Sequence, residues 1–342
     1  MRALTSLRMA VSRGELHLDP AGFCSQTRVL IVAGKGGVGK TTVSAALARM
    51  AALAGLTTLI VEIEGKSGLS HAFGRAQPLS YEEVTLAPGG GRSGAADVRA
   101  RTLTPDDALI EYLHDHGMRR ISKRLMKSGA VDVVSTAVPG IRDILVLGKV
   151  KALERDARAD LIVLDAPAAG HAVSFLMSAT GLLDAVRVGP IRTQAQEVVD
   201  LLSDPTRCQV LLVTLPEETP VNEVVETAFK LEDRVGVSLA PVVVNGLYPT
   251  LTGLDEDPVA AAAAAGAHLR DGEGATLREA ASFRQQRQTL QAKQVARLAD
   301  ALPLPQLHLP YLFTTGLGPD EVDVLAAALG DAVRGLPEPV VR

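Results

Sequence analysis

Short apolar runs alternate along the chain with longer segments in which apolar positions recur every three or four residues. The short runs have the length of a β-strand, are bounded by turn residues and are apolar at nearly every position. Strands of that kind are typical of a parallel sheet that is covered by helices on both faces. We predict such strands at Arg28–Ala33, Thr57–Ile63, Asp160–Ala166, Gln209–Leu215, Ala240–Asn245 and Leu307–Leu312.

The alternation of these strands with helical segments indicates βαβ units, because parallel neighbours need a crossover that is usually a helix. We therefore predict an α/β fold with a mostly parallel, doubly wound sheet and helices on both faces. Residues 28–342 are expected to form one domain with a helical subdomain at about 104–156. Residues 1–27 show neither period and are predicted to be a poorly ordered extension.

The composition narrows the classes of protein that fit. The 35 Lys and Arg against 39 Asp and Glu give a net charge of −4, so we expect no nucleic-acid partner. Cys24 and Cys208 stand far apart without a CxxC pair, which argues against a disulfide framework and a cysteine zinc site. We expect no membrane span and no signal peptide, and a reducing, cytoplasmic location.

The segment Gly34–Thr42 follows the first predicted strand and precedes a predicted helix at Val43–Ala54. It matches GxxxxGK[ST], the phosphate loop (P-loop) of nucleoside triphosphatases, in the strand, loop and helix context which that motif requires. Lys40 is expected to reach the β- and γ-phosphates of ATP, and Thr41 to offer its hydroxyl to Mg²⁺. The predicted phosphate-binding residues are Gly34, Lys35, Gly36, Gly37, Val38, Gly39, Lys40, Thr41 and Thr42.

The same glycines allow a second interpretation. Gly34, Gly36 and Gly39 also match GxGxxG, and Glu62 follows at the end of the next strand, as in a dinucleotide-binding site. A glycine-rich turn without a ligand is a third reading. Lys40 favours the triphosphatase, because a nicotinamide site has no use for an ammonium group at that position.

Asp165 follows directly after a predicted buried strand. Ligands of α/β sheets bind at the carboxyl ends of the strands, and a carboxylate there can hold Mg²⁺ directly or through water. We predict Asp165 as a catalytic residue that holds Mg²⁺ together with Thr41, and the N–H of Gly170 as a sensor of the γ-phosphate. The other reading of Asp165 is a helix-capping carboxylate.

Lys35, directly after the first glycine in GKGGVGKTT, makes this loop resemble the deviant Walker A signature. That signature belongs to the MinD, ParA, nitrogenase iron protein and ArsA group of dimeric ATPases. The resemblance implies that Lys35 reaches across a nucleotide-sandwich dimer to the partner's phosphates, which would couple hydrolysis to dimer closure. The alternative is a solvated loop lysine.

Further segments resemble those of the ArsA and guided-entry (tail-anchored protein targeting) ATPases. The sequence DAPAAGHAVSFL at 165–176 is similar to switch II of that family, with alanines in place of its proline and threonine. Residues 62–73 resemble switch I, which places Glu64 where the family has a water-positioning aspartate. The resemblance thus implies Glu64 as a catalytic residue; the alternative is that Glu64 only caps a turn. The segments 242–248 and 309–313 resemble the adenine-binding loops and imply base contacts from Asn245, Pro310 and Leu312.

The chain departs from the family in two ways: it has no CxxC zinc clasp, and it has few methionines after switch II. These departures argue against arsenite binding and against tail-anchored protein targeting. We predict Mg²⁺-dependent ATP hydrolysis by a homodimer, or by a heterodimer with a paralogous ATPase, coupled to a protein client or partner; a hydrophobic protein is one candidate for that client. Two alternatives stay open: a weakly hydrolysing regulatory or chaperone-like subunit, and a partition ATPase like MinD or ParA.

Overall fold

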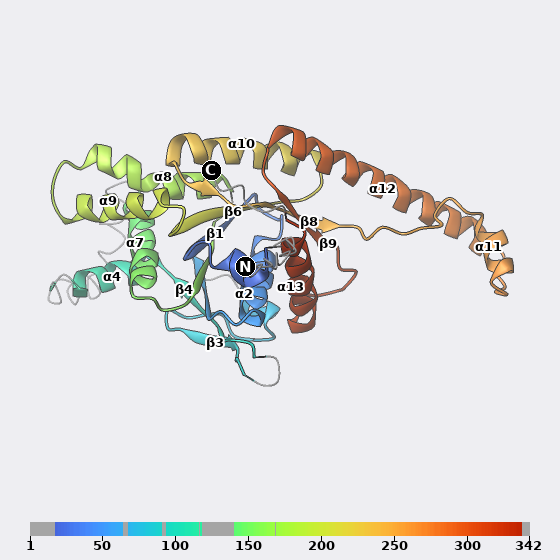
Figure 1. The fold of residues 1–342 in the computed structure, drawn as a ribbon, viewed down its shortest axis with the longest axis horizontal. Coiled ribbons are helices and arrows are strands. Elements are labelled where there is room, and N and C mark those ends of the chain that lie inside the picture. The colour runs from blue at the N-terminus through green and yellow to red at the C-terminus, as the bar shows by residue number, and fades with distance from the viewer. Residues whose placement is uncertain are drawn as a thin grey trace, which may run out of the picture.

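The computed structural model describes residues 18–63, 68–90, 94–115, 117, 140–167 and 169–336. Within these ranges the strands form one nine-stranded sheet in the order β3-β4-β2-β5-β1-β6-β8-β9, with β7 beside β6 (Figure 1). The strand pairs are parallel, except for the antiparallel pair of β3 and β4. The strands are β1 (Val29–Ala33), β2 (Thr58–Ile63), β3 (Val84–Ala87), β4 (Val98–Leu103), β5 (Leu161–Asp165), β6 (Cys208–Thr214), β7 (Ser238–Leu239), β8 (Val242–Leu247) and β9 (Gln306–Pro310).

Helices cover both faces of this sheet, which confirms the predicted α/β architecture. One face carries α4, α7, α8, α9 and α10, and the other carries α1, α2, α3 and α13. The helices are α1 (Pro20–Cys24), α2 (Lys40–Leu53), α3 (Gly68–Ala72), α4 (Pro105–Asp115), α7 (Ile141–Arg155), α8 (Ala169–Ala185), α9 (Pro190–Ser203), α10 (Glu218–Val235), α11 (Pro258–Ala264), α12 (Glu273–Ala301) and α13 (Pro319–Arg334).

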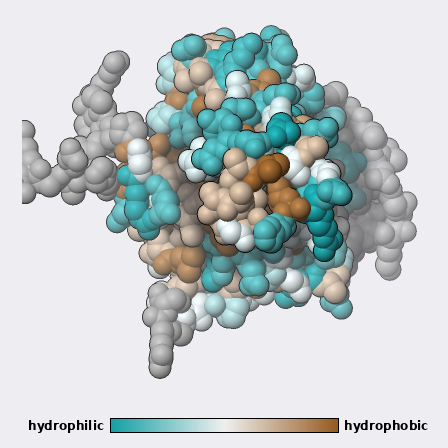
Figure 2. Space-filling view, turned by 90° about the vertical axis from the view of Figure 1, so that its right-hand side faces the viewer, coloured by the Kyte–Doolittle hydropathy of each residue, from teal (hydrophilic) through white to brown (hydrophobic). Residues whose placement is uncertain are grey.

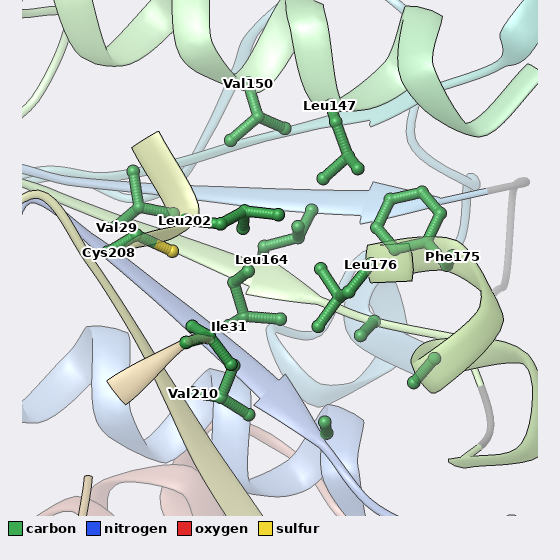
Figure 3. Packing of buried hydrophobic residues seen from close by; sticks show 14 of the residues in the cluster. Val29, Ile31, Leu147, Val150, Leu164, Phe175, Leu176, Leu202, Cys208 and Val210 are labelled. Carbon is green, nitrogen blue, oxygen red and sulfur yellow. The ribbon is translucent and has the colours of Figure 1, made fainter. Parts of the chain in front are cut away.

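Successive side chains of the central strands enter opposite layers of the core. In β1, Val29 and Ile31 face the layer of α7, α8 and α9, whereas Leu30 and Val32 face the layer of α2 and α13. Figure 3 shows the first layer, where Ile31 and residues of β5 and β6 point toward side chains of α7 and α8. This two-sided burial is why the central strands are apolar at nearly every position.

All six predicted strands are present, with bounds that differ by one or two residues. β3 and β4, at one edge of the sheet, were not predicted, because arginines interrupt the apolar pattern of β4. Arg101 on β4 is buried and lies over the ring of Tyr81, with 4.3 Å between the guanidinium carbon and the ring centroid. The sheet therefore continues through a polar edge that an apolar pattern does not reveal.

Part of the predicted extension is folded. Residues 20–24, which we assigned to the poorly ordered segment, form α1, and Phe23 and Cys24 are buried against α2 and α13. Helix α1 therefore packs as part of the domain, whereas residues 1–17 lie outside the described residues. Helices α4 and α7 fall within the predicted helical subdomain, and most of the segment between them also lies outside the description.

A helical arm, formed by α11 and α12, projects from the sheet (Figure 1). Helix α12 buries only Gln291, Gln294 and Leu298, all in its second half, and α11 buries none of its residues. Figure 2 looks onto the side from which the arm projects and shows a small apolar patch surrounded by hydrophilic residues. The arm is joined to the domain through α12 from Arg284 onward, where Arg284 and Gln288 donate hydrogen bonds to the carbonyl oxygen of Pro249.

Candidate functional site

The candidate site lies at the carboxyl end of β1, where the strands that follow in sequence are added first on one side of β1 and later on the other. β1 sits between β5 and β6, so the loop after β1 leaves the sheet beside the carboxyl ends of both neighbours. This point in a doubly wound sheet is where ligands bind. The loop is Gly34–Gly39, and it leads directly into α2, which begins at Lys40.

Glycines allow this loop to pass closely between its neighbours. A Cβ atom on Gly34 would lie 2.4 Å from the carbonyl oxygen of Val213 on β6, too close for any other residue. Gly37 and Gly39 have φ angles of 86° and 90°, a left-handed conformation that favours glycine. The loop thus has the tight path that turns backbone N–H groups toward a phosphate at a helix N-terminus.

The first turn of α2 brings together three side chains predicted for ATP and Mg²⁺. Lys40 is buried, and its Nζ donates a 3.0 Å hydrogen bond to the carbonyl oxygen of Lys35, across the loop. The Thr41 hydroxyl donates a 2.7 Å hydrogen bond to Oδ2 of Asp165, which is fully buried at the end of β5. A lysine, a hydroxyl and a carboxylate therefore meet beside the loop.

Glu62 is a further acidic residue at this edge, and the sequence did not reveal its position in the site. It lies on β2 in register with Asp165 on the adjacent parallel strand, and it is fully buried. Residues in register on neighbouring strands stand about 5 Å apart and point to the same face. The two carboxylates come together because β2 pairs with β5 in the sheet. The sequence placed Glu62 near the end of a predicted strand but did not show which strand lies beside it.

Asn245 contacts the loop from β8. Its Nδ2 donates a 3.0 Å hydrogen bond to the carbonyl oxygen of Val38, and a Cβ atom on Gly39 would lie 2.3 Å from that same nitrogen. Its Oδ1 is the part of the amide that can still accept a hydrogen bond from a ligand. Asn245 therefore lies against the phosphate loop, and its predicted contact with the adenine stays a prediction.

The ends of β8 and β9 are joined beside Asn245. The N–H of Tyr311 donates a 2.7 Å hydrogen bond to the carbonyl oxygen of Leu247, and Tyr248, Tyr311 and Phe313 pack with ring centroids 4.9 to 5.4 Å apart. A cavity of about 670 Å³ lies between these strand ends and α12, and Pro310 is among its lining residues.

That cavity has an uncharged, mostly apolar character near the strand ends. His308 also lines it, and burial lowers the pKa of the His308 ring, so the ring is neutral at pH 7. Leu312, the third predicted base contact, is half-buried against the core layer of α2 and α13 and is not among the residues that line the cavity.

The side chain of Lys35 points away from the loop. Its Nζ forms an ion pair with Oε1 of Glu223 on α10, and 47% of the lysine side chain is exposed. Glu223 lies 188 residues away in the sequence, in a helix that carried no site prediction. The contact could therefore be found only from the tertiary structure.

Some predicted residues are not placed by these contacts. Glu64 lies outside the described residues, and Gly170 stands in the first turn of α8. Among the described residues, no cluster of three or more His, Cys, Asp or Glu side chains could hold a metal by itself. No helix in the described ranges is long and apolar enough to span a membrane.

Comparison with known proteins agrees with this geometry. The profile of the ArsA family, described as anion-transporting ATPase, matches residues 27–187. The chain is also 34% identical over 305 residues to ATPase BagA of Mycobacterium tuberculosis, and the alignment covers 84% of this chain and 88% of that protein. This chain belongs to the ArsA ATPase family.

Other members of the ArsA family are similar over shorter lengths. The arsenical pump-driving ATPase of Escherichia coli is 27% identical, over 68% of this chain and 41% of that protein. ATPase get3 of Schizosaccharomyces japonicus is 28% identical, over 48% of this chain and 50% of that protein. The family match includes the loop after β1 and the end of β5, so this ArsA-family chain is an ATPase.

Proposed function

We propose that this ArsA-family ATPase works as a cytoplasmic, Mg²⁺-dependent nucleotide-sandwich dimer whose closure is coupled to a protein partner. The observation that carries the catalytic part is the meeting of Lys40, Thr41 and Asp165 at the start of α2. Positioning and charge stabilisation supply most of the rate enhancement in phosphoryl transfer, and these three side chains provide both.

The chemistry of the side chains fits Mg²⁺. Asp165 and the Thr41 hydroxyl are oxygen donors, which Mg²⁺ prefers, and a P-loop site completes the metal's shell with phosphate oxygens and water. When bound, the ion would neutralise charge that develops on the β- and γ-phosphate oxygens. Asp165 and Thr41 would hold it, while Lys40 leaves the Lys35 carbonyl oxygen for the phosphates.

The remaining predicted residues have separate roles in this proposal. Lys35 reaches the partner subunit's phosphates, the N–H of Gly170 senses the γ-phosphate, and Glu64 positions the attacking water. Asn245 and Pro310 contact the adenine, which is supported by the hydrogen bond of Asn245 to the loop and by the neutral cavity beside Pro310.

The decisive experiment measures phosphate release by the purified chain with Mg²⁺–ATP, in the wild type and in Lys40→Ala. We expect the variant to lose at least about a hundredfold in kcat, the scale seen when one charge-stabilising donor is removed. Lys230→Ala is the matched control, because Lys230 is an exposed lysine on α10 that pairs only locally, with Glu226. Equal rates in the wild type and Lys40→Ala would overturn the assigned site.

The dimer is tested by light-scattering mass in Mg²⁺–ATP and in Mg²⁺–ADP. We expect the mass to double with ATP in the wild type and to stay at one chain in Lys40→Ala. Mixing with a paralogous ATPase separates a heterodimer from a homodimer. A chain that hydrolyses ATP at normal rates while remaining a monomer would contradict the sandwich arrangement.

A further inference from the structure

Glu223 forms an ion pair with Lys35, the lysine that the proposed dimer requires at the partner subunit's phosphates. In this single chain the Lys35 ammonium is paired with Oε1 of Glu223, while the backbone oxygen of Lys35 accepts from Lys40. The backbone of the loop therefore has the conformation expected for binding phosphate, while the side chain of Lys35 is directed toward α10. One ammonium group cannot remain in this ion pair and also bind phosphates across a dimer interface.

We propose that Glu223 is a latch that keeps Lys35 withdrawn until ATP closes the dimer, so that Glu223 sets the ATP concentration at which closure occurs. This inference rests on the proposed role of Lys35. The packing of α10 on β6 and α8 fixes the position of the carboxylate, because Val221 and Val224 on either side of Glu223 are buried in the core.

The surroundings of Glu223 show why the latch holds. Its Oε2 is buried and accepts no hydrogen bond from the described part of the chain. Among the described residues, the ion pair with Lys35 therefore provides the charged partner of this carboxylate. When Lys35 leaves, the carboxylate loses its charged partner, which opposes closure. The pair is partly exposed, with 34% of the Glu223 side chain accessible, so this opposition is modest.

The expected size of the effect follows from that exposure. Exposed ion pairs change an equilibrium by about one- to fivefold. Glu223→Gln keeps the shape of the side chain and removes its charge, so we expect about a two- to fivefold lower ATP concentration for half-maximal dimer formation and hydrolysis. The kcat at saturating ATP should stay the same, because the latch is already open in the closed dimer.

The matched control is Glu226→Gln, one turn further along α10. Glu226 pairs with Lys230 rather than with Lys35, and its loss changes the net charge of the helix by the same amount. We expect its half-saturating ATP concentration to equal that of the wild type.

The latch itself is tested without nucleotide, by acetylating the full chain with a succinimidyl acetate ester and measuring each lysine by peptide mass spectrometry. Glu223→Gln should increase the acetylation rate at Lys35 about twofold or more, and Glu226→Gln should increase it only at Lys230. Circular dichroism melting checks that both variants are folded; Glu223→Ala, which also removes the charge, replaces Glu223→Gln if the latter is not.

The outcomes separate the two proposals. If wild-type protein forms no dimer with Mg²⁺–ATP, the proposed function fails and the latch fails with it. If the wild type closes and depends on Lys35, yet Glu223→Gln and Glu226→Gln have the same half-saturating ATP concentration, only the latch is overturned. A higher half-saturating concentration in Glu223→Gln would overturn it as well.

Discussion

Thr41 on α2 donates a 2.7 Å hydrogen bond to Asp165 on β5, and this bond joins two elements that are 124 residues apart. Asp165 is fully buried and ends the strand beside β1, whereas Thr41 lies in the first turn of the helix after β1. The bond therefore aligns the start of the helix with the edge of the sheet before any ligand arrives. Such alignment lowers the cost of organising a metal and phosphate site.

Replacing Thr41 tests this alignment. Thr41→Val keeps the shape but removes the donor, so we expect the Mg²⁺ concentration for half-maximal hydrolysis to rise about tenfold. Without nucleotide, the free energy of unfolding should fall by about 1–3 kcal/mol, because the buried carboxylate of Asp165 loses this hydrogen bond. Thr41→Ser retains the hydroxyl and should restore both values. Titration with Mg²⁺ and urea unfolding measure them, and unchanged Mg²⁺ dependence in Thr41→Val would contradict the role.

Gly39 and Gly37 form a matched pair for the loop. Both have left-handed φ angles, so alanine at either position should cost about 1–2 kcal/mol of folding stability. A Cβ atom at Gly37 meets nothing within 4 Å, whereas one at Gly39 lies 2.3 Å from Asn245 Nδ2. Gly39→Ala should therefore cost about 1 kcal/mol more, by breaking the hydrogen bond from Asn245.

Urea unfolding of the nucleotide-free variants checks this difference. Adding Asn245→Ala should recover part of the loss in Gly39→Ala and none in Gly37→Ala, because only the first variant forces Asn245 aside. Equal free energies of unfolding for the two glycine variants would show that the contact with Asn245 does not contribute to folding stability.

A second glycine pair tests the helical layer. Gly148 on α7 is buried, and a Cβ atom there would lie 1.7 Å from Nε2 of Gln194 on α9. Gly148→Ala must displace the Gln194 side chain, whose Oε1 accepts a hydrogen bond from Lys151, so it should destabilise the fold by about 1 kcal/mol. Gly181 lies within α8 with nothing inside 4 Å, and Gly181→Ala should stabilise it by roughly 0.5–1 kcal/mol. Denaturant midpoints measure both, and shifts in the same direction would contradict this packing.

The two cysteines make stability depend on pH. Burial raises the pKa of Cys24 and of Cys208 from 9.0 to about 12. The unfolded chain loses these protons from about pH 9 while the folded chain keeps them, so stability should fall between pH 9 and 12. The slope is up to about 1.4 kcal/mol per pH unit for each thiol.

Thiol labelling is the direct measurement. At pH 8 an aromatic disulfide reagent should modify neither cysteine in the folded protein and both in denaturant. The pH slope above 9 should become shallower in Cys24→Ala/Cys208→Ala. Rapid modification of the native protein would show that the burial is not maintained in solution.

The central fold and the phosphate loop were predictable because their signals are local. The strands around β1 are apolar at nearly every position, and the loop is a contiguous segment that carries its own motif. Asp165 was predictable for a related reason, since the end of a buried parallel strand is a ligand position in this architecture.

Other features depend on elements that are distant in sequence. β4 was missed because Arg99 and Arg101 interrupt its apolar pattern, although Arg101 is buried over Tyr81. Glu62 stands beside Asp165 only because β2 pairs with β5, and Glu223 meets Lys35 only because α10 packs next to β6. The roles of Glu64 and of the adenine contacts stay predictions.

The arm of α11 and α12 has a consequence for measurements in solution. A helical arm that extends from a compact domain increases the friction of the molecule far more than it increases its mass. A monomer of this shape migrates through a gel-filtration column like a larger compact protein, in the direction of a dimer. Elution volume therefore gives the wrong subunit count for this ATPase, and absolute mass from scattering or sedimentation gives the right one.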